Sequence, residues 1–239
     1  MNINTEFLEC VGSTNTVARQ RIDEGADEWY TVVAHSQSSG EGRLGRSFFS
    51  PDKTGLYMST VLYPEFDCIE YITGGAAVAV CRSLEELGFA PRIKWVNDIF
   101  VDGKKVCGIL AKAIHRQDGV AVILGIGVNV YKPQGGFPED IRDTAGYLFE
   151  NETKGERQRL FESVINNLQS VFSDIKSEEH LVEYRKRCLT VGRKVSVVPV
   201  GKEPAEAVAL SVDAAYHLTV RYADGREETL NSGEVSVRI

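Results

Sequence analysis

The sequence is poor in the residues that build disulfide frameworks and metal sites. Its five cysteines are scattered over 239 residues, and no two of them form a C-x-x-C pair. An odd and dispersed set of cysteines favours reduced thiols in apolar surroundings over disulfides or a zinc site. The four histidines are equally dispersed, so we expect no histidine-based metal site in the protein.

Long apolar runs are missing as well. The longest apolar windows, such as 120–130, are far shorter than the roughly 20 residues that a membrane helix needs. The first residues, MNINTEFLEC, lack the basic and then apolar order of a signal peptide. We therefore expect a cytoplasmic protein that makes no contact with a membrane.

Basic charge is in deficit. Lysine and arginine total 27 against 34 acidic residues, which gives a formal net charge of −7. No overall positive field attracts nucleic acid, so any anion must be bound by a local cluster of cations. The hydrophobic content of 43% and the charged content of 26% are typical of a globular protein with one large core and a smaller one.

One glycine-rich stretch supplies such a cluster. The segment SSGEGRLGRSFFSP, residues 38–51, contains three glycines and two arginines, which are Gly40, Gly42, Gly45, Arg43 and Arg46. Glycine lets backbone N–H groups approach a ligand closely, and the planar arginine fork suits phosphate or carboxylate. We predict an anion-binding loop, although Glu41 in its middle has the wrong sign.

Hydrophobic periodicity predicts an α+β fold for most of the chain. The expected helices cover 13–23, 73–87, 158–175 and 181–188, and the expected strands cover 30–35, 55–62, 92–96, 105–114 and 120–130. Asp-Gly pairs at 102–103 and 118–119 are turn signals, which favours an antiparallel meander. The fold class is thus a largely antiparallel mixed sheet with packed helices. The Pro- and Gly-rich residues 133–138 are expected to form a mobile lid.

The pattern changes near residue 189. Short strands are expected at 194–200, 207–212, 218–223, 226–230 and 234–239, with no room for helices between them. Such a run is typical of a small β-barrel. We therefore predict two domains, 1–188 and 189–239.

Each chemical motif has a purely structural explanation when it is taken alone. Ser13, Thr14 and Asn15 could simply cap a helix, and Asn97 could belong to a turn. Lys94 at a strand end is the usual place for a surface lysine, and the glycines of GIGVNV, residues 125–130, could serve close packing. Only the order and spacing of the motifs together favour a functional site.

Together these motifs resemble those of the bacterial biotin protein ligases over nearly the whole chain. They are STN at a helix start, Q-x-x-G-x-G-R-x-G-R-x-F-F-S-P, K-W-x-N-D, K-x-x-G-I-L and G-I-G-x-N-V. The resemblance implies a ligase that joins biotin to ATP as biotinyl-5′-AMP and transfers biotin to a lysine of a biotin carboxyl carrier protein, such as that of acetyl-CoA carboxylase. It also implies a biotin/lipoate ligase-like catalytic domain followed by an SH3-like barrel.

The same resemblance implies the site residues. Lys94 and Arg43 are the expected catalytic residues, with Lys94 between the biotin carboxylate and the α-phosphate of ATP. The expected biotin-binding residues are Ser13, Thr14, Asn15, Gln37, Gly40, Glu41, Gly42, Arg43, Phe48, Lys94, Gly108, Leu110, Gly125 and Gly127. The expected ATP-binding residues are Arg43, Arg46, Lys94, Asn97 and Asn129, the last near the adenine. Mg²⁺ is expected on the phosphates, held mostly by oxygen and water, with no metal ligand assigned in the protein.

Two positions depart from the family pattern. Glu41 stands where the loop usually has an arginine, and Val96 stands where K-W-P-N-D has proline. Glu41 could pair with Arg43 or with another cation, which would weaken the loop as a clamp without disabling it. Two alternatives follow, a non-catalytic module that binds biotin or the carrier, and a lipoate protein ligase. Few residues precede Ser13, so we expect no N-terminal DNA-binding domain, and we expect a monomer or a homodimer.

Overall fold

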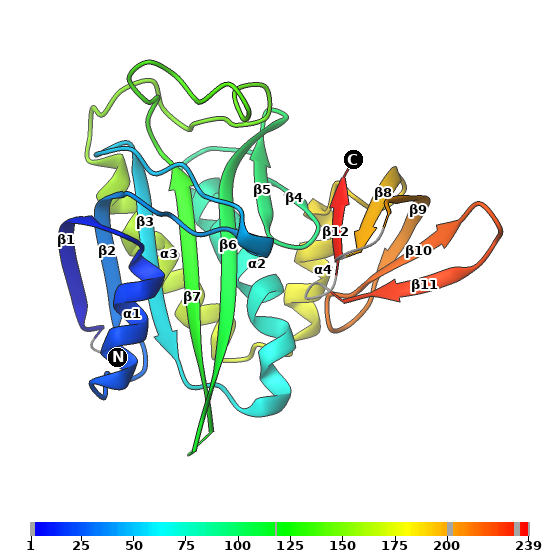
Figure 1. The fold of residues 1–239 in the computed structure, drawn as a ribbon, viewed down its shortest axis with the longest axis horizontal. Coiled ribbons are helices and arrows are strands. Elements are labelled where there is room, and N and C mark those ends of the chain that lie inside the picture. Colours follow the sequence, from blue (N-terminus) through cyan, green and yellow to red (C-terminus); the bar gives the residue numbers. More distant parts are fainter. Residues whose placement is uncertain (1–2, 118, 200–202, 232–234, 239) are drawn as a thin grey trace.

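The computed structural model describes residues 3–117, 119–199, 203–231 and 235–238. Its larger sheet contains β1 (Thr5–Val11), β2 (Thr31–Gln37), β3 (Gly55–Leu62), β4 (Arg92–Lys94), β5 (Asp98–Val101), β6 (Lys104–Arg116) and β7 (Gly119–Asn129). The strand order is β1-β2-β3-β7-β6-β5-β4 (Figure 1). β1 and β2 are parallel, and the other neighbours are antiparallel. The predicted largely antiparallel mixed sheet is therefore confirmed.

Helices cover both faces of this sheet. The short helix α1 (Thr14–Asp23) lies on one face, while α2 (Ile72–Glu86) and α3 (Glu156–Phe172) lie on the other (Figure 1). Ala18 and Ile22 of α1 pack on Val32 and Ala121 in a small apolar cluster. Because both faces are covered, every residue of β3 is buried, so this strand reads as a continuous apolar run rather than an alternation.

In the described residues, the expected helices and strands recur within a few positions, with two exceptions, while residues 118, 200, 234 and 239 of the expected turn and strands lie outside the described structure. β1 was not predicted. Its seven residues are partly exposed, and only the pairing with β2 at the edge of the sheet identifies them as a strand. The expected strand 92–96 ends at Lys94, where a turn leads into β5, a four-residue strand too short for a periodicity signal. Of the helices in the described part of the chain, none is both long and apolar enough to cross a membrane.

The smaller sheet follows the last helix, α4 (Glu178–Arg187). It contains β8 (Lys194–Pro199), β9 (Ala205–Val212), β10 (Leu218–Tyr222), β11 (Glu227–Leu230) and β12 (Val235–Arg238), in the order β11-β10-β9-β8-β12. All its pairs are antiparallel, which is consistent with the predicted SH3-like module. Val195 and Val220 of this sheet belong to the same buried cluster as Ile93 and Trp95 of the larger unit.

Candidate functional site

A cavity of about 330 Å³ lies beneath the glycine-rich loop. Its wall is built by the start of α1, the loop between β2 and β3, the turn between β4 and β5, and the middle of β6 and β7. Most of the predicted site residues meet here, namely Thr14, Asn15, Gln37, Glu41, Gly42, Arg43, Arg46, Phe48, Lys94, Asn97, Gly108, Leu110, Gly125 and Gly127. Residues that are up to about a hundred positions apart in the sequence thus share one hollow.

Hydrogen bonds fix the side chains at one end of the cavity. Gln37 Oε1 accepts from the backbone N–H of Thr14 at 2.8 Å and lies 3.1 Å from its hydroxyl, and Gln37 Nε2 donates to Ser50 Oγ at 2.9 Å. The hydroxyl of Ser59 lies 2.7 Å from Thr14 Oγ1 and 2.8 Å from Asn15 Oδ1. Thr14, Asn15 and Ser59 are all buried. Polar side chains locked in this way form a preorganised surface for a polar ligand.

Phe48 and two glycines build an apolar wall. A Cβ added at Gly127 would lie 2.6 Å from the Phe48 ring, and one at Gly108 would lie 3.2 Å from it. These glycines therefore make room for the Phe48 ring, and their expected contact with biotin stays a prediction. A Cβ at Gly125 would lie 2.6 Å from Asn15 Oδ1, so this glycine admits the Asn15 side chain.

The cavity wall also carries cationic side chains. Among the described residues, four cationic side chains line the wall, which are Arg43, Arg46, Lys94 and Lys105. The carboxylates among the lining residues are Glu41 and Asp98, and each of them pairs with a lysine; Asp98 Oδ1 lies 2.7 Å from Lys105 Nζ. Cationic side chains thus outnumber carboxylates among the described lining residues, which suits an anionic ligand.

Arg43 joins the loop to the β4–β5 turn. Its Nη1 donates to Asn97 Oδ1 at 3.1 Å, and Asn97 Nδ2 in turn donates to the carbonyl of Ile109 at 2.8 Å. Burial lowers the pKa of the Arg43 guanidinium, and the nearby Asp98 carboxylate opposes that shift. An arginine remains protonated in proteins at neutral pH, so the site keeps this charge.

The glycine-rich loop is an ordered hairpin. The N–H of Gly42 donates to the carbonyl of Arg46 at 2.7 Å, and the N–H of Phe48 donates to the carbonyl of Gly40 at 2.8 Å. Leu44 and Gly45 form its tip with φ angles of +54° and +72°, which are left-handed values. Loop and cavity are thus positioned by backbone hydrogen bonds as well as by side chains.

Three predicted residues lie outside the cavity wall in the described structure. Ser13 is buried and caps α1, with its hydroxyl accepting from the N–H of Asn15 at 3.2 Å. Gly40 lies against Phe48 at the base of the hairpin, where a Cβ would be 2.4 Å from the Phe48 carbonyl. Asn129 Nδ2 donates to the carbonyl of Gly146 at 2.9 Å and so ties β7 to the following loop. The contacts of these three residues support the wall. Their roles as ligand-binding residues stay predictions.

Other lining residues were not singled out from the sequence. They include Met58, Trp95, Asp98, Phe100 and Lys105. Trp95 and Asp98 belong to K-W-x-N-D, and Lys105 opens K-x-x-G-I-L, so the motifs themselves carried the signal for these three. The side chain of Val96 in the same turn is buried, and the Trp95–Val96 peptide bond is cis.

The predicted lid lies beside the hairpin. Phe137 contacts Phe49 of the glycine-rich segment, with ring centroids 6.2 Å apart, and stacks on Tyr147 at 6.5 Å. Ile141 and Thr144, a few residues further along, line the cavity. The two loops are therefore in contact, and a closing movement of 133–138 stays a prediction.

Comparison with known proteins gives consistent relatives. The model of the Biotin/lipoate A/B protein ligase family matches residues 7–129. The bifunctional ligase/repressor BirA of Bacillus subtilis is 37% identical over 155 residues, which is 63% of this chain and 47% of that protein, so the chain matches about half of that relative's length. The biotin–[acetyl-CoA-carboxylase] ligase of Mycobacterium tuberculosis is 26% identical over 94% of this chain and 85% of its own. The structure of Aquifex aeolicus biotin protein ligase in complex with biotin and ATP aligns over 98% of both chains, with a TM-score of 0.76 and 27% identity.

Proposed function

Because this chain belongs to the biotin/lipoate A/B protein ligase family, we propose that it is a biotin protein ligase that uses ATP. The observation that carries the proposal is the cavity itself, in which fixed polar side chains, an apolar wall and cationic side chains lie together. The names of the relatives support the substrates, since one is a biotin–[acetyl-CoA-carboxylase] ligase and a similar structure holds biotin and ATP.

The first step is adenylation of biotin. A carboxylate oxygen of biotin attacks the α-phosphorus of ATP, a new C(O)O–P bond forms, and the bond to the β-phosphate oxygen breaks. Pyrophosphate leaves with the bonding electron pair, and biotinyl-5′-AMP remains in the cavity. No proton is transferred in this step, so the task of the protein is to align two anions and to offset their repulsion.

Lys94 and Arg43 supply that offset. Two unit charges ~4 Å apart interact by about 4 kcal/mol at an effective dielectric constant near 20, which corresponds to a rate factor on the order of a thousand. Lys94 at the end of β4 acts between the carboxylate and the α-phosphate, and Arg43 holds the adenylate from the hairpin. Arg46 and Asn97 add contacts to the phosphates, and Asn129 lies on the side proposed for the adenine.

The polar and apolar ends suit the two parts of biotin. The ureido group of biotin needs both donors and acceptors, which Thr14, Asn15 and Gln37 carry on fixed side chains. The fused rings need an apolar surface, which Phe48 and Leu110 provide on the wall. The polar residues would thus recognise the ureido group and the fused rings of biotin, and the carboxylate of biotin would point toward Lys94.

Mg²⁺ would enter with the nucleotide. It prefers oxygen ligands and is usually held by one or two carboxylates together with phosphates and water. Asp98 fits this preference, because its carboxylate lies on the cavity wall beside Lys105. When bound, the ion neutralises phosphate charge, and Asp98 is the residue that would hold it.

The second step is transfer to a carrier. The amine of a carrier lysine attacks the acyl carbon of the adenylate, an amide forms, AMP leaves with the electron pair of the C–O bond, and the amine loses a proton to solvent. The partner is a biotin carboxyl carrier protein of acetyl-CoA carboxylase or of another biotin-dependent carboxylase. We further propose that the protein acts in the cytoplasm, which its free cysteines support, as a monomer or a homodimer that does not bind DNA.

One assay tests this function. The protein is incubated with ATP, Mg²⁺ and either biotin or lipoate, pyrophosphate release is measured, and a carrier domain is then added and analysed by mass spectrometry. We expect biotin-dependent release followed by biotinylation of one lysine. Equal turnover with lipoate would identify a lipoate ligase, and binding of biotin without pyrophosphate release would identify a non-catalytic module.

A further inference from the structure

The turn between β4 and β5 is held by residues from the last quarter of the chain. It consists of Trp95, Val96 and Asn97, and it separates Lys94 from Asp98, which face each other across the β4–β5 pair. Trp95 and Val96 are each only 3% exposed, so their backbone groups need partners inside the protein. In the described structure, the Trp95 N–H and the Val96 carbonyl have partners from outside the cavity strands, whereas Asn97 bonds to Ile109 of β6 through its side chain and its carbonyl.

Three hydrogen bonds reach the turn from this distant region. The N–H of Trp95 donates to Thr190 Oγ1 at 2.9 Å, and its indole Nε1 donates to the carbonyl of Tyr216 at 2.7 Å. The hydroxyl of Tyr184 donates to the carbonyl of Val96 at 3.1 Å. Thr190 and Tyr184 are fully buried and Tyr216 is 3% exposed, so water does not compete for these bonds.

Tyr216 is seated between helices by close packing. It lies in the turn between β9 and β10 with a φ of +63°, a left-handed value that is rare for a tyrosine. A Cβ added at Gly74 of α2 would lie 2.3 Å from the Tyr216 ring, so this helix has a glycine where the ring enters. The ring also packs edge-on against Tyr184 at 4.9 Å.

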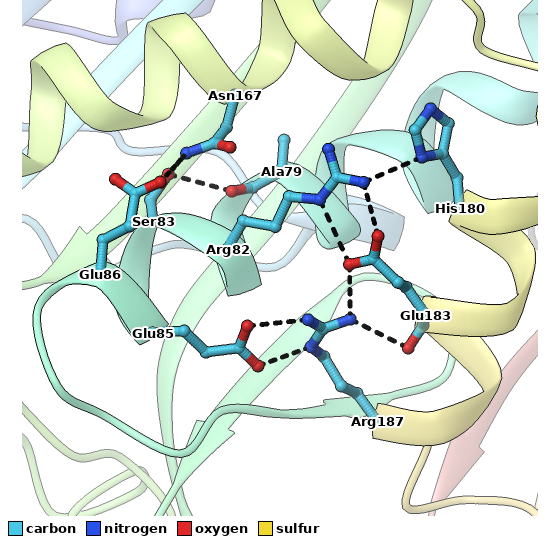
Figure 2. Close-up of polar contacts among 9 residues, drawn as sticks. All are labelled: Ala79, Arg82, Ser83, Glu85, Glu86, Asn167, His180, Glu183 and Arg187. Atoms are coloured by element: carbon cyan, nitrogen blue, oxygen red, sulfur yellow. Dashed lines mark hydrogen bonds and ion pairs between the residues drawn. The ribbon is translucent and has the colours of Figure 1, made fainter.

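The helix that carries Tyr184 is itself fixed. Arg187 of α4 contacts Glu85 of α2 at 2.8 Å, and Arg82 of α2 contacts Glu183 of α4 at 2.5 Å (Figure 2). Arg185 Nε donates to the carbonyl of Val212 in β9 at 2.8 Å. α4 is therefore joined both to the larger unit and to the smaller sheet, and this makes it a rigid support for the turn.

We infer that Thr190, Tyr184 and Tyr216 are positioning residues that hold Lys94 and Asn97 in place for adenylation. The inference rests on the proposed ligase function. It crosses the proposed boundary between the domains 1–188 and 189–239, because Thr190 and Tyr216 of the second segment hold a turn of the first one. The position of Asn97 also fixes Arg43, because Asn97 Oδ1 accepts a hydrogen bond from the Arg43 guanidinium at 3.1 Å.

The physical reason lies in the precision that adenylation needs. Lys94 acts only if its charge lies beside the reacting oxygen and phosphorus atoms, and small displacements from that position lose much of the rate. Loss of a buried acceptor leaves the N–H of Trp95 without a partner, so the turn must shift toward another one. The residues proposed to hold biotin, Thr14, Gln37 and Phe48, belong to α1, β2 and the hairpin and not to the turn that Thr190 holds, so biotin binding should change little.

The experiment compares two substitutions of Thr190. Thr190→Val keeps the shape but removes the acceptor, and Thr190→Ser keeps the acceptor. We expect Thr190→Val to lower the kcat of biotin-dependent pyrophosphate release about tenfold, or about 1.4 kcal/mol, with KM for biotin within about twofold. Thr190→Ser should restore kcat. Thr31→Val is the matched control. Thr31, the first residue of β2, is also fully buried, and its hydroxyl donates to the carbonyl of Trp29 at 3.1 Å. Thr31 is not among the residues that line the cavity in the described structure.

The outcomes separate the two proposals. If Thr190→Val lowers the melting temperature as Thr31→Val does but keeps kcat, Thr190 is only structural and the inference is wrong. If the wild type releases no pyrophosphate with biotin, the ligase proposal fails instead. In that case the fluorescence emission of Trp95 still tests the inference, measured in a Trp29→Phe background that leaves Trp95 as the single tryptophan. If Thr190 holds the turn, Thr190→Val shifts the emission maximum of Trp95. An unchanged emission spectrum overturns the inference.

Discussion

The carboxylate of Glu41 in the hairpin pairs with the ammonium of Lys112 on β6. The same carboxylate accepts a hydrogen bond from Asn15 Nδ2 at 3.4 Å. Glu41 therefore takes a cation other than Arg43 and leaves the Arg43 guanidinium on Asn97. The departure from the family pattern at this position ties the hairpin to β6 in place of adding a cation to the loop.

Breaking this pair should loosen the loop, so the pair supports the clamp, where the sequence led us to expect that Glu41 would weaken it. The two side chains are 32% and 46% exposed, so their interaction is worth only ~0 to 1 kcal/mol, or up to about fivefold in a rate. We expect Glu41→Gln and Lys112→Met each to speed the escape of the adenylate by up to that factor, measured by quenched-flow or chase experiments. The double variant should match either single variant, and the reversed pair Glu41→Lys with Lys112→Glu should restore retention. Additive effects would show that the two residues act independently.

Lys94→Gln should abolish adenylation and leave the fold intact. The substitution removes the charge proposed between the biotin carboxylate and the α-phosphate, which is worth a rate factor on the order of a thousand. Pyrophosphate release measures the loss, and the melting temperature checks the fold. Lys176→Gln is the control, because Lys176 pairs with Asp67 on the surface. Near-normal turnover of Lys94→Gln would mean that this lysine has no catalytic role.

Gly127→Ala should weaken biotin binding. The new methyl group would overlap the Phe48 ring at 2.6 Å, so the ring must leave its place on the apolar wall. We expect KM for biotin to rise about tenfold with a smaller change in kcat. Gly12→Ala adds the same methyl group where no atom lies within 4 Å, and it should leave KM unchanged. An unchanged KM in Gly127→Ala would remove Phe48 from the biotin wall.

Glu156 should stabilise the fold only above strongly acidic pH. Its carboxylate accepts from Thr153 Oγ1 at 2.7 Å and from the N–H of Lys154 at 3.0 Å, and these bonds lower its pKa from 4.5 to about 2. A pKa lowered in the folded state means that the stabilisation is complete above about pH 4.5 and is lost as the pH falls toward 2. The difference in melting temperature between wild type and Glu156→Gln should therefore shrink between pH 5 and pH 3. A constant difference over this range would contradict the prediction.

Local patterns predicted most of the fold. α1 begins where Ser13 can cap it, and β3, β6 and β7 lie where β-branched runs and Asp-Gly turns indicated. Local patterns missed two strands, β1 and β5, because each gave too short or too weak a hydrophobic alternation. β1 is recognisable only by its pairing with β2, and β5 has four residues, so neither has a period long enough to stand out.

The sequence by itself predicted the parts of the site, because the spacing of its motifs indicated a glycine-rich loop with two arginines, a lysine at a strand end and closely packed glycines. Tertiary structure alone decided the partners of those residues. Glu41 meets Lys112, Phe48 takes the space at Gly127, and Trp95 is held from Thr190 and Tyr216. Each of these contacts joins residues that are far apart in the chain. Which cation, cavity or carbonyl a side chain can reach depends on how the helices and sheets pack against each other. No local sequence pattern contains that information.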